Sequence, residues 1–194
     1  QSVEPVTLRP AGKGVVALRV TLPNRVDTII STMGGDTRLR QSKDGKFGFA
    51  GDFAHVAENA DGGGWAYMIG GSQLRIGRKN VKAKPAYEGV ITETLRTEAG
   101  DKTNAFITAT KLPTDGSLDG HTLMVDEGGL LVQSFRIKNV ERRGGKTLIH
   151  SLDEPGMTIT PGLIKLEYFP CWGIKGEARF RIAGTALLRV STKQ

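Results

Sequence analysis

The sequence predicts an all-β protein, an antiparallel β-sandwich of many short strands. Short runs of alternating apolar and polar residues recur along the chain, and Gly, Pro, Asn or Asp bounds each run. Asp-Gly and Gly-Gly pairs, which favour hairpin turns, separate several of these runs. No window carries apolar residues at i, i+3, i+4 and i+7 over three helical turns. Crossover helices, and with them parallel βαβ units, are therefore excluded.

The predicted strands follow one another closely and are rich in β-branched or aromatic residues. In the first part of the chain they are 15–22, 26–32, 37–41, 53–59, 65–71 and 73–77. In the remainder they are 89–97, 105–112, 122–127, 130–140, 147–152, 157–160, 163–169, 178–184 and 186–192. Asp-Gly or Gly-Gly turns are predicted at 43–46, 60–63, 114–117, 118–121 and 141–146. We expect loops over 112–121 and over 94–104, although 94–104 comes nearest to a helical composition.

A chain of 194 residues fits one domain or two very small ones. No linker, low-complexity tract or change in composition divides it, so we expect a single β-sandwich domain over 1–194. A β-solenoid is the structural alternative, but no fixed-period repeat supports it. Because the chain begins with Gln1 and carries no leader, we expect it to be excised from or processed out of a larger protein that is secreted or periplasmic.

The chain is basic: 27 Lys and Arg residues outnumber 20 Asp and Glu residues, for a formal charge of +7. This excess favours anionic partners such as acidic polysaccharide, nucleic acid or anionic lipid. The densest basic segments, 75–84 and 136–146, lack the interleaved aromatic residues of a single-strand nucleic-acid platform, so nucleic acid is the weaker interpretation. No run of about 18 apolar residues is present, so no membrane span is predicted.

The sequence nominates no catalytic residue. It lacks the G-x-S-x-G and S-x-x-K signatures of serine nucleophiles, a P-loop, and a G-x-G-x-x-G that opens a helix. Acidic groups at 58–61, 114–120 and 152–156 are interpreted as ordinary turns. A structural Ca²⁺ ion bound by these loops is the alternative, since Ca²⁺ favours carboxylate and carbonyl ligands, and no other cofactor is expected.

The few cysteine and histidine residues do not form a recognisable site. Cys171 is the only cysteine, so no internal disulfide can form, and its aromatic neighbours indicate a small buried hydrophobe. The histidines lack metal-ligand spacing, and a site assembled in space with Asp52 or Asp126 is left as an alternative. His150 shares a strand face with Leu148 and Leu152, which favours a core histidine. The histidines are His55, His121 and His150.

The first aromatic cluster follows the glycines of "ENADGGGWAYMIGG", residues 58–71. Trp65 and Tyr67 alternate with Ala66 and Met68, so both faces of the strand are apolar. This pattern favours a central strand of a sandwich. We expect Trp65 to face the core, with a sugar-facing platform as the alternative.

The second aromatic cluster, "LEYFPCWG" at 166–173, contains Pro170, which cannot continue a central strand. The chain should therefore leave the sheet there and place Trp172 at a loop or an edge. Indole stacks on the C–H face of a sugar ring, and Lys or Arg can pair with uronate or sulfate groups. The ligand-binding candidates are Trp172, Tyr168, Trp65, Tyr67, Lys175, Arg179 and Arg181, with Phe169 and Lys165 nearby.

Three segments resemble heparinase II/III-like polysaccharide lyases and related secreted bacterial proteins. They are "GDFAHVAENADGGGWAYMIGGSQLRIG", "LDGHTLMVDEGGLLVQSFRIKNVERRGGKTLIHSLDEPGMTI" and "YFPCWGIKGEARFRIAG", within 26–184. These are strand-and-turn patterns, and no residue matches the family's catalytic Tyr, His or Asn. The family's helical toroid has no counterpart. The resemblance implies the terminal β-sandwich alone, which would pack on a catalytic domain, bind polysaccharide, or both.

We therefore expect a non-catalytic, carbohydrate-binding accessory module that acts on polysaccharide, with acidic polymers favoured by the charge. One alternative is a small polysaccharide lyase or metal-dependent carbohydrate-active enzyme that uses one of the histidines, with Tyr67, Tyr87 or Tyr168 as further acid–base candidates. The other alternative is a purely structural domain that packs on a catalytic neighbour, which predicts a large exposed apolar patch.

Overall fold

A computed structural model describes residues 1–32, 38–168 and 171–190. The predicted all-β class is confirmed, because the strands, numbered β1 to β20, form antiparallel sheets. The one helical turn among the described residues is η1 (Thr97–Ala99). That turn lies inside the segment 94–104, which sequence analysis assigned to a loop. The described part of the chain contains no helix with the length and apolar character needed to cross a membrane.

The chain divides into two compact units, where sequence analysis expected one domain. Unit 1 combines Gln1–Ala86 with Ala183–Gln194, and unit 2 is Tyr87–Ile182. Unit 2 is thus an insertion between two parts of unit 1. Both crossing points fall at strand ends, in β11 (Ala86–Leu95) and β19 (Ala178–Ala183). The chain passes between the units within strands and not through a linker, so no change in composition marks the boundary.

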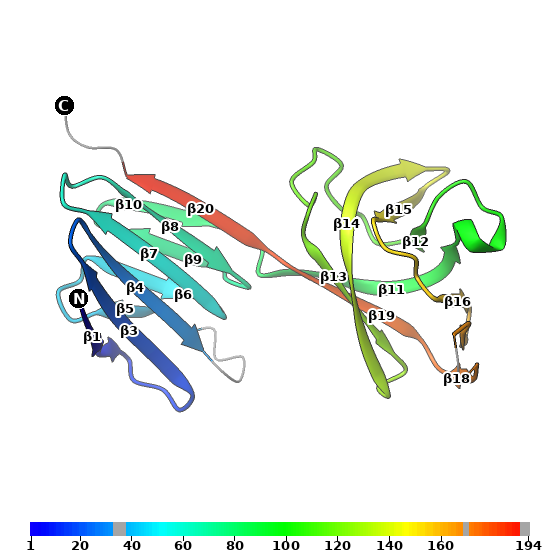
Figure 1. Ribbon diagram of the computed structural model, residues 1–194, viewed down its shortest axis with the longest axis horizontal. Coiled ribbons are helices and arrows are strands. Elements are labelled where there is room, and N and C mark those ends of the chain that lie inside the picture. Colours follow the sequence, from blue (N-terminus) through cyan, green and yellow to red (C-terminus); the bar gives the residue numbers. More distant parts are fainter. Residues whose placement is uncertain (33–37, 169–170, 191–194) are drawn as a thin grey trace. The chain divides into compact units, whose positions relative to one another are not determined.

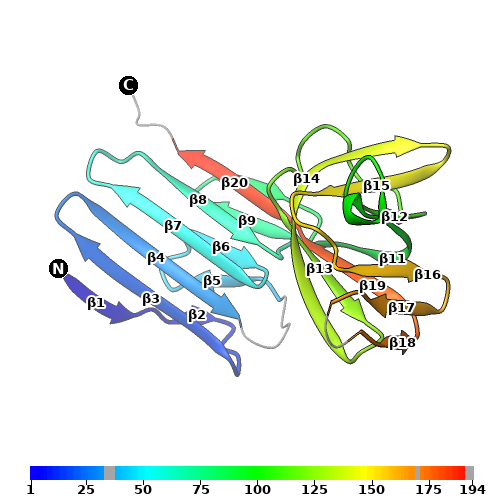
Figure 2. The same ribbon diagram turned by 45° about the vertical axis from the view of Figure 1, so that its right-hand side comes forward.

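Unit 1 contains two antiparallel sheets. Figure 2 shows the strands of the six-stranded sheet side by side. In spatial order they are β1 (Ser2–Pro5), β3 (Val15–Leu22), β4 (Arg25–Thr32), β7 (Phe53–Asn59), β8 (Gly64–Ile69) and β20 (Thr185–Val190). The five-stranded sheet has the order β10 (Lys79–Lys82), β9 (Gln73–Ile76), β6 (Phe47–Ala50), β5 (Arg40–Ser42) and β2 (Leu8–Arg9).

The core of unit 1 draws side chains from both sheets, as in a sandwich. The six-stranded sheet contributes Ile30, Val56, Ala66 and Met68, among others, and the five-stranded sheet contributes Phe49 and its neighbours. Because side chains alternate across a strand, the residues between these positions project from the opposite side of the six-stranded sheet. We call that side the outer face.

Unit 2 contains a closed barrel of six strands and a small three-stranded sheet (Figure 1). The barrel order is β11, β12 (Ala105–Thr108), β15 (Lys146–Ser151), β14 (Leu131–Arg143), β13 (Thr122–Glu127) and β19. The small sheet has the order β16 (Met157–Thr160), β17 (Leu163–Leu166) and β18 (Gly173–Lys175). One apolar cluster, which includes Phe106, Phe135, Ile149, Ile164 and Phe180, joins barrel and sheet.

Arg96, a buried cation just after β11, links three glutamates in unit 2. Its guanidinium lies 2.6 Å from Glu154, 3.5 Å from Glu98 and 3.7 Å from Glu167. These partners come from η1, from the loop before β16 and from the end of the small sheet. Arg96 therefore ties the end of β11 to segments far away in the sequence.

Glu127 ends β13 and is fully buried inside unit 2. Neither of its carboxylate oxygens has a hydrogen-bond partner among the described residues. Burial raises the pKa of the Glu127 carboxyl, and the nearby amide of Gln133 offsets this effect only in part. The protonated form is thus the one that the fold favours.

Candidate ligand-binding face

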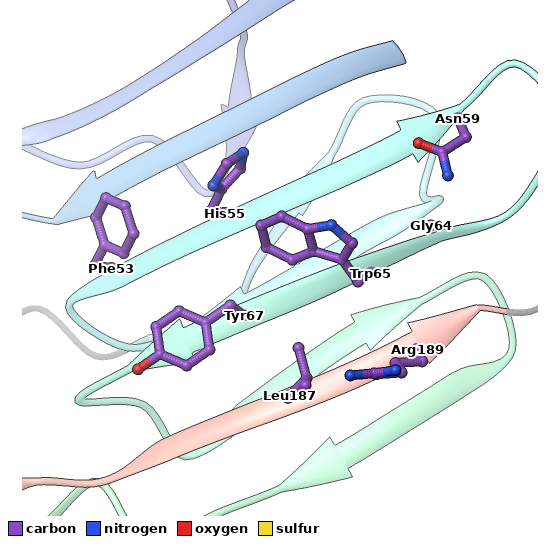
Figure 3. A pocket seen from close by; sticks show the side chains of 8 residues that line it. All are labelled: Phe53, His55, Asn59, Gly64, Trp65, Tyr67, Leu187 and Arg189. Carbon is purple, nitrogen blue, oxygen red and sulfur yellow. The ribbon is translucent and has the colours of Figure 1, made fainter. Parts of the chain in front are cut away.

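The outer face of unit 1 carries an aromatic platform, which we define as Phe53, His55, Trp65 and Tyr67. It forms the floor of an open depression of about 590 Å³ that spans β7, β8 and β20 (Figure 3). The remaining residues around the depression are Asn59 from β7, Gly64 from β8, and Leu187 and Arg189 from β20.

Strand register explains why these side chains meet. His55 lies opposite Tyr67 across the β7–β8 pair, and Trp65 and Tyr67 lie opposite Arg189 and Leu187 across the β8–β20 pair. Residues opposite each other in an antiparallel pair project from the same face, with Cβ atoms about 4.5–5.5 Å apart. The platform is therefore set by backbone pairing and does not depend on a loop.

A chain of polar contacts fixes the middle of the platform. The Nε–H group of Arg25 donates a hydrogen bond of 3.1 Å to Asp27 Oδ2, and Arg25 Nη2 lies 2.9 Å from the same oxygen. His55 Nε2 lies 3.1 Å from the other oxygen of Asp27, which is buried. The imidazole then meets the indole of Trp65 edge-on, with ring centroids 4.7 Å apart. The orientation of Trp65 is thereby linked to a buried, fully paired carboxylate.

Close approach of two strands requires glycine at Gly64, immediately before Trp65. A Cβ atom at this position would collide with the carbonyl oxygen of Ala57 on the facing strand. Gly64 also lines the end of the depression beside Asn59. The last of the glycines before the aromatic pair is thus required by the close approach of β7 and β8.

The structure corrects the prediction that Trp65 faces the core. Ala66 and Met68 are fully buried and face the second sheet, whereas Trp65 and Tyr67 are half-buried on the outer face. Both faces of β8 are apolar, so alternation alone cannot say which one is inside. Ala66 and Met68 belong to the core cluster that includes Phe49 and Leu74 of the second sheet, so the other face of β8 is the outer one.

The other predicted aromatic residues belong to unit 2, whereas the platform belongs to unit 1. Trp172 and Tyr168 are 51% and 53% exposed beside the small sheet, and Lys175 is exposed in β18. The Tyr168 hydroxyl donates to Glu98 at 3.3 Å. Phe169 and Pro170, which the cluster also contains, lie outside the described residues.

Arg179 and Arg181 project from β19 into a different depression of unit 2, of about 550 Å³. Met124 and Val132 form its apolar part, and Trp172 does not line it. Arg179 is paired with Glu177 at 3.1 Å, and Arg181 lies 3.7 Å from Glu88. Arg179 and Arg181 therefore line a depression that does not include Trp172.

Cysteine and histidine also differ from expectation. Cys171 is exposed, not buried, because the segment leaves the small sheet before this residue. His150 lies 3.0 Å from the Thr103 hydroxyl and 3.4 Å from Glu141, so it is a half-buried histidine in polar contacts and not an apolar core residue. Over residues 1–32, 38–168 and 171–190, no three His, Cys, Asp or Glu side chains gather to hold a metal ion.

Sequence analysis missed six residues of the site: Arg25, Asp27, Phe53, Asn59, Leu187 and Arg189. Phe53 carried a usable signal, because it shares a strand face with His55. Leu187 and Arg189 carried none, since their strand reaches β8 only after the chain has passed through unit 2. Comparisons with protein-family models, with curated proteins and with solved structures find no match for this chain.

Proposed function

We propose that the chain is a non-catalytic, carbohydrate-binding accessory module that binds polysaccharide across the aromatic platform of unit 1. One observation carries the proposal: Phe53, Trp65 and Tyr67 share one open sheet face, and His55 with Asp27 holds the indole of Trp65. Sugar rings have C–H faces that stack on such rings. Asn59 and Arg189 at the rim supply polar groups for the sugar hydroxyls.

The openness of the site favours a polymer over a small molecule. The depression lies on the exposed side of three adjacent strands, so a chain can enter and leave at either end. Small-molecule sites instead bury most of the ligand in a cleft. The formal charge of +7 supports a preference for acidic polymers, and we propose action outside the cytoplasm, in a secreted or periplasmic protein.

Affinity electrophoresis in gels that contain alginate, heparin, pectin or a neutral glucan tests this proposal. We expect the wild-type chain to be retarded by at least one polymer, and Trp65→Ala to abolish the retardation. Trp172→Ala is the matched control, because it removes the other tryptophan from an exposed position in unit 2. Free migration of the wild-type chain in every gel at low salt would refute the proposal, as would loss of binding in the Trp172 variant alone.

A second candidate function is structural, and the same outer face favours it. Val3, Val16 and Leu18 are exposed on β1 and β3, which belong to the same sheet as the platform and are separated from β7 by β4. Together with Leu187 they make this face apolar over much of its width. A domain that covers a catalytic neighbour would bury them. Val16→Lys with Leu18→Lys would then abolish association with that neighbour, whereas a glycan-binding module would keep its retardation in polysaccharide gels.

A further inference from the structure

The outer face of unit 1 has few charged side chains, and their arrangement is informative. On the described strands of this sheet the register places one acid on the outer face, Asp27. The cationic groups there are Arg25 and Arg189, with His55 between them. The face therefore carries more positive than negative charge.

The charge of Asp27 is already compensated. One of its oxygens is bonded to Arg25, the other lies 3.1 Å from His55 Nε2, and the side chain is 8% exposed. It therefore has little capacity left to accept hydrogen bonds from sugar hydroxyls or to repel an anion. Arg25 is committed to the same pair, which leaves Arg189 as the cation of the depression that faces the ligand.

Arg189 is exposed, and no carboxylate lies within ion-pair distance of its side chain among the described residues. Its backbone carbonyl accepts a hydrogen bond of 2.9 Å from Lys79 Nζ, which holds the strand at this point and brings a second positive charge nearby. A guanidinium presents N–H groups in a planar fork that matches the oxygens of a carboxylate or a sulfate. Among the described residues, Arg189 is thus a guanidinium on an anchored strand that is available to pair with an anion.

Trp65 and Arg189 face each other directly across β8 and β20. Opposite side chains on one face have Cβ atoms only about 5 Å apart, so a single sugar ring on the indole also reaches the guanidinium. The geometry points to one conclusion, which rests on the proposed function: the sugar unit stacked on Trp65 is itself anionic, and Arg189 determines this specificity by pairing with its carboxylate or sulfate group.

Matched polymers separate charge from backbone chemistry. Polygalacturonate is compared with its fully methyl-esterified form, and dextran sulfate with dextran, so that each pair differs only in the anionic group. We expect the wild-type chain to bind at least one charged member well above its neutral partner. The first pair reports on carboxylate and the second on sulfate.

Arg189→Gln should weaken binding to the charged polymer about 10- to 100-fold, the range of a lost charge-assisted hydrogen bond, and leave any neutral binding unchanged. Arg189→Lys should recover only part of the loss, since an ammonium cannot make the fork contact. Arg78→Gln is the control, because it removes the same charge from an exposed turn between β9 and β10. Arg189 is exposed, so we expect all three variants to unfold at the wild-type temperature.

Three outcomes distinguish the failures. Equal weakening by the Arg189 and Arg78 variants would show that net charge alone attracts the polymer, which overturns this inference but leaves the platform intact. If charged and neutral polymers bind equally and Trp65→Ala abolishes both, this inference is likewise overturned while the platform remains the binding site. Absence of any binding in the wild-type chain would instead refute the proposed function, and this inference with it.

Discussion

The imidazole of His55 stands edge-on to the indole of Trp65, with their planes inclined at 68° and their centroids 4.7 Å apart. His55 is held in turn by buried Asp27, and Asp27 by Arg25. An aromatic ring that is already oriented loses less conformational entropy when a ligand stacks on it. The polar chain beneath the platform is therefore a means of preorganising Trp65.

Asp27→Ala should damage both fold and binding. The change leaves His55 and Arg25 without their buried acceptor, and we expect unit 1 to lose about 1–3 kcal/mol of unfolding free energy. Binding to the polymers of the electrophoresis test should weaken although Trp65 is unchanged. Asp119→Ala, in an exposed loop of unit 2, is the control for denaturant unfolding. Wild-type affinity in a folded Asp27 variant would show that the polar chain does not position the indole.

The position of Trp65 shows what a sequence can and cannot specify. Its strand, its turn and its alternation with Ala66 were all predictable from local chemistry, and the structure confirms them. Which face is buried depends on the side that the second sheet covers, and the strands of that sheet come from segments between residues 8 and 82. The same limit applies to Arg189, whose partner strand becomes its neighbour only through the insertion of unit 2.

Intrinsic fluorescence can locate a ligand because the chain has only two tryptophans, Trp65 and Trp172. In Trp172→Phe the emission reports on the platform alone, and we expect it to shift or be quenched when a bound polymer is titrated in. In Trp65→Phe the emission reports on exposed Trp172 and should stay constant. The reverse result would place the ligand beside the small sheet of unit 2, where the sequence first suggested it.

Arg96→Met should destabilise unit 2 by about 3–5 kcal/mol, because it removes the cation from a buried network and leaves the carboxylate of Glu154 without its ion-pair partner. Denaturant unfolding in a Trp65→Phe background, followed by Trp172 fluorescence, measures the loss. Arg143→Gln breaks an exposed pair with Glu141 and should change the unfolding free energy by no more than about 0.5 kcal/mol. If the two variants cost the same, the Arg96 network does not hold the segments of unit 2 together.

The strand ends and short edges were the least predictable parts of the fold. Strands β1, β2, β10 and β18 are only two to four residues long and lack the alternation that identifies longer strands. They form because a neighbouring strand offers hydrogen-bond partners, which is a tertiary condition. The division into units escaped detection for a related reason: strands β11 and β19, not a linker, carry the chain across.

Two glutamates of unit 2, Glu167 and Glu127, should make its stability depend on pH in opposite directions. Hydrogen bonds from Thr158 and then Lys165 hold the pKa of the Glu167 carboxyl below its ordinary value of 4.5. Its contribution to stability is therefore present above that value and is lost as the pH falls. Glu127 behaves in the opposite way, because burial raises the pKa of its carboxyl. Its contribution is complete below 4.5, the ordinary value, and is lost as the pH rises through its pKa in the folded chain.

Glu127→Gln isolates the second effect, because it keeps the shape of the side chain and removes the ionisation. Near pH 4 we expect the variant and the wild-type chain to be about equally stable, since both side chains are then neutral. Near pH 8 the variant should be more stable by about 1–3 kcal/mol, because the wild-type chain must either bury a carboxylate that has no partner or hold a proton there against the solvent. Denaturant unfolding of both proteins in a Trp65→Phe background across this range, followed by Trp172 fluorescence, measures the difference. A variant that is less stable than the wild-type chain near pH 8 would mean that the Glu127 carboxylate is stabilised in its charged form, contrary to its full burial.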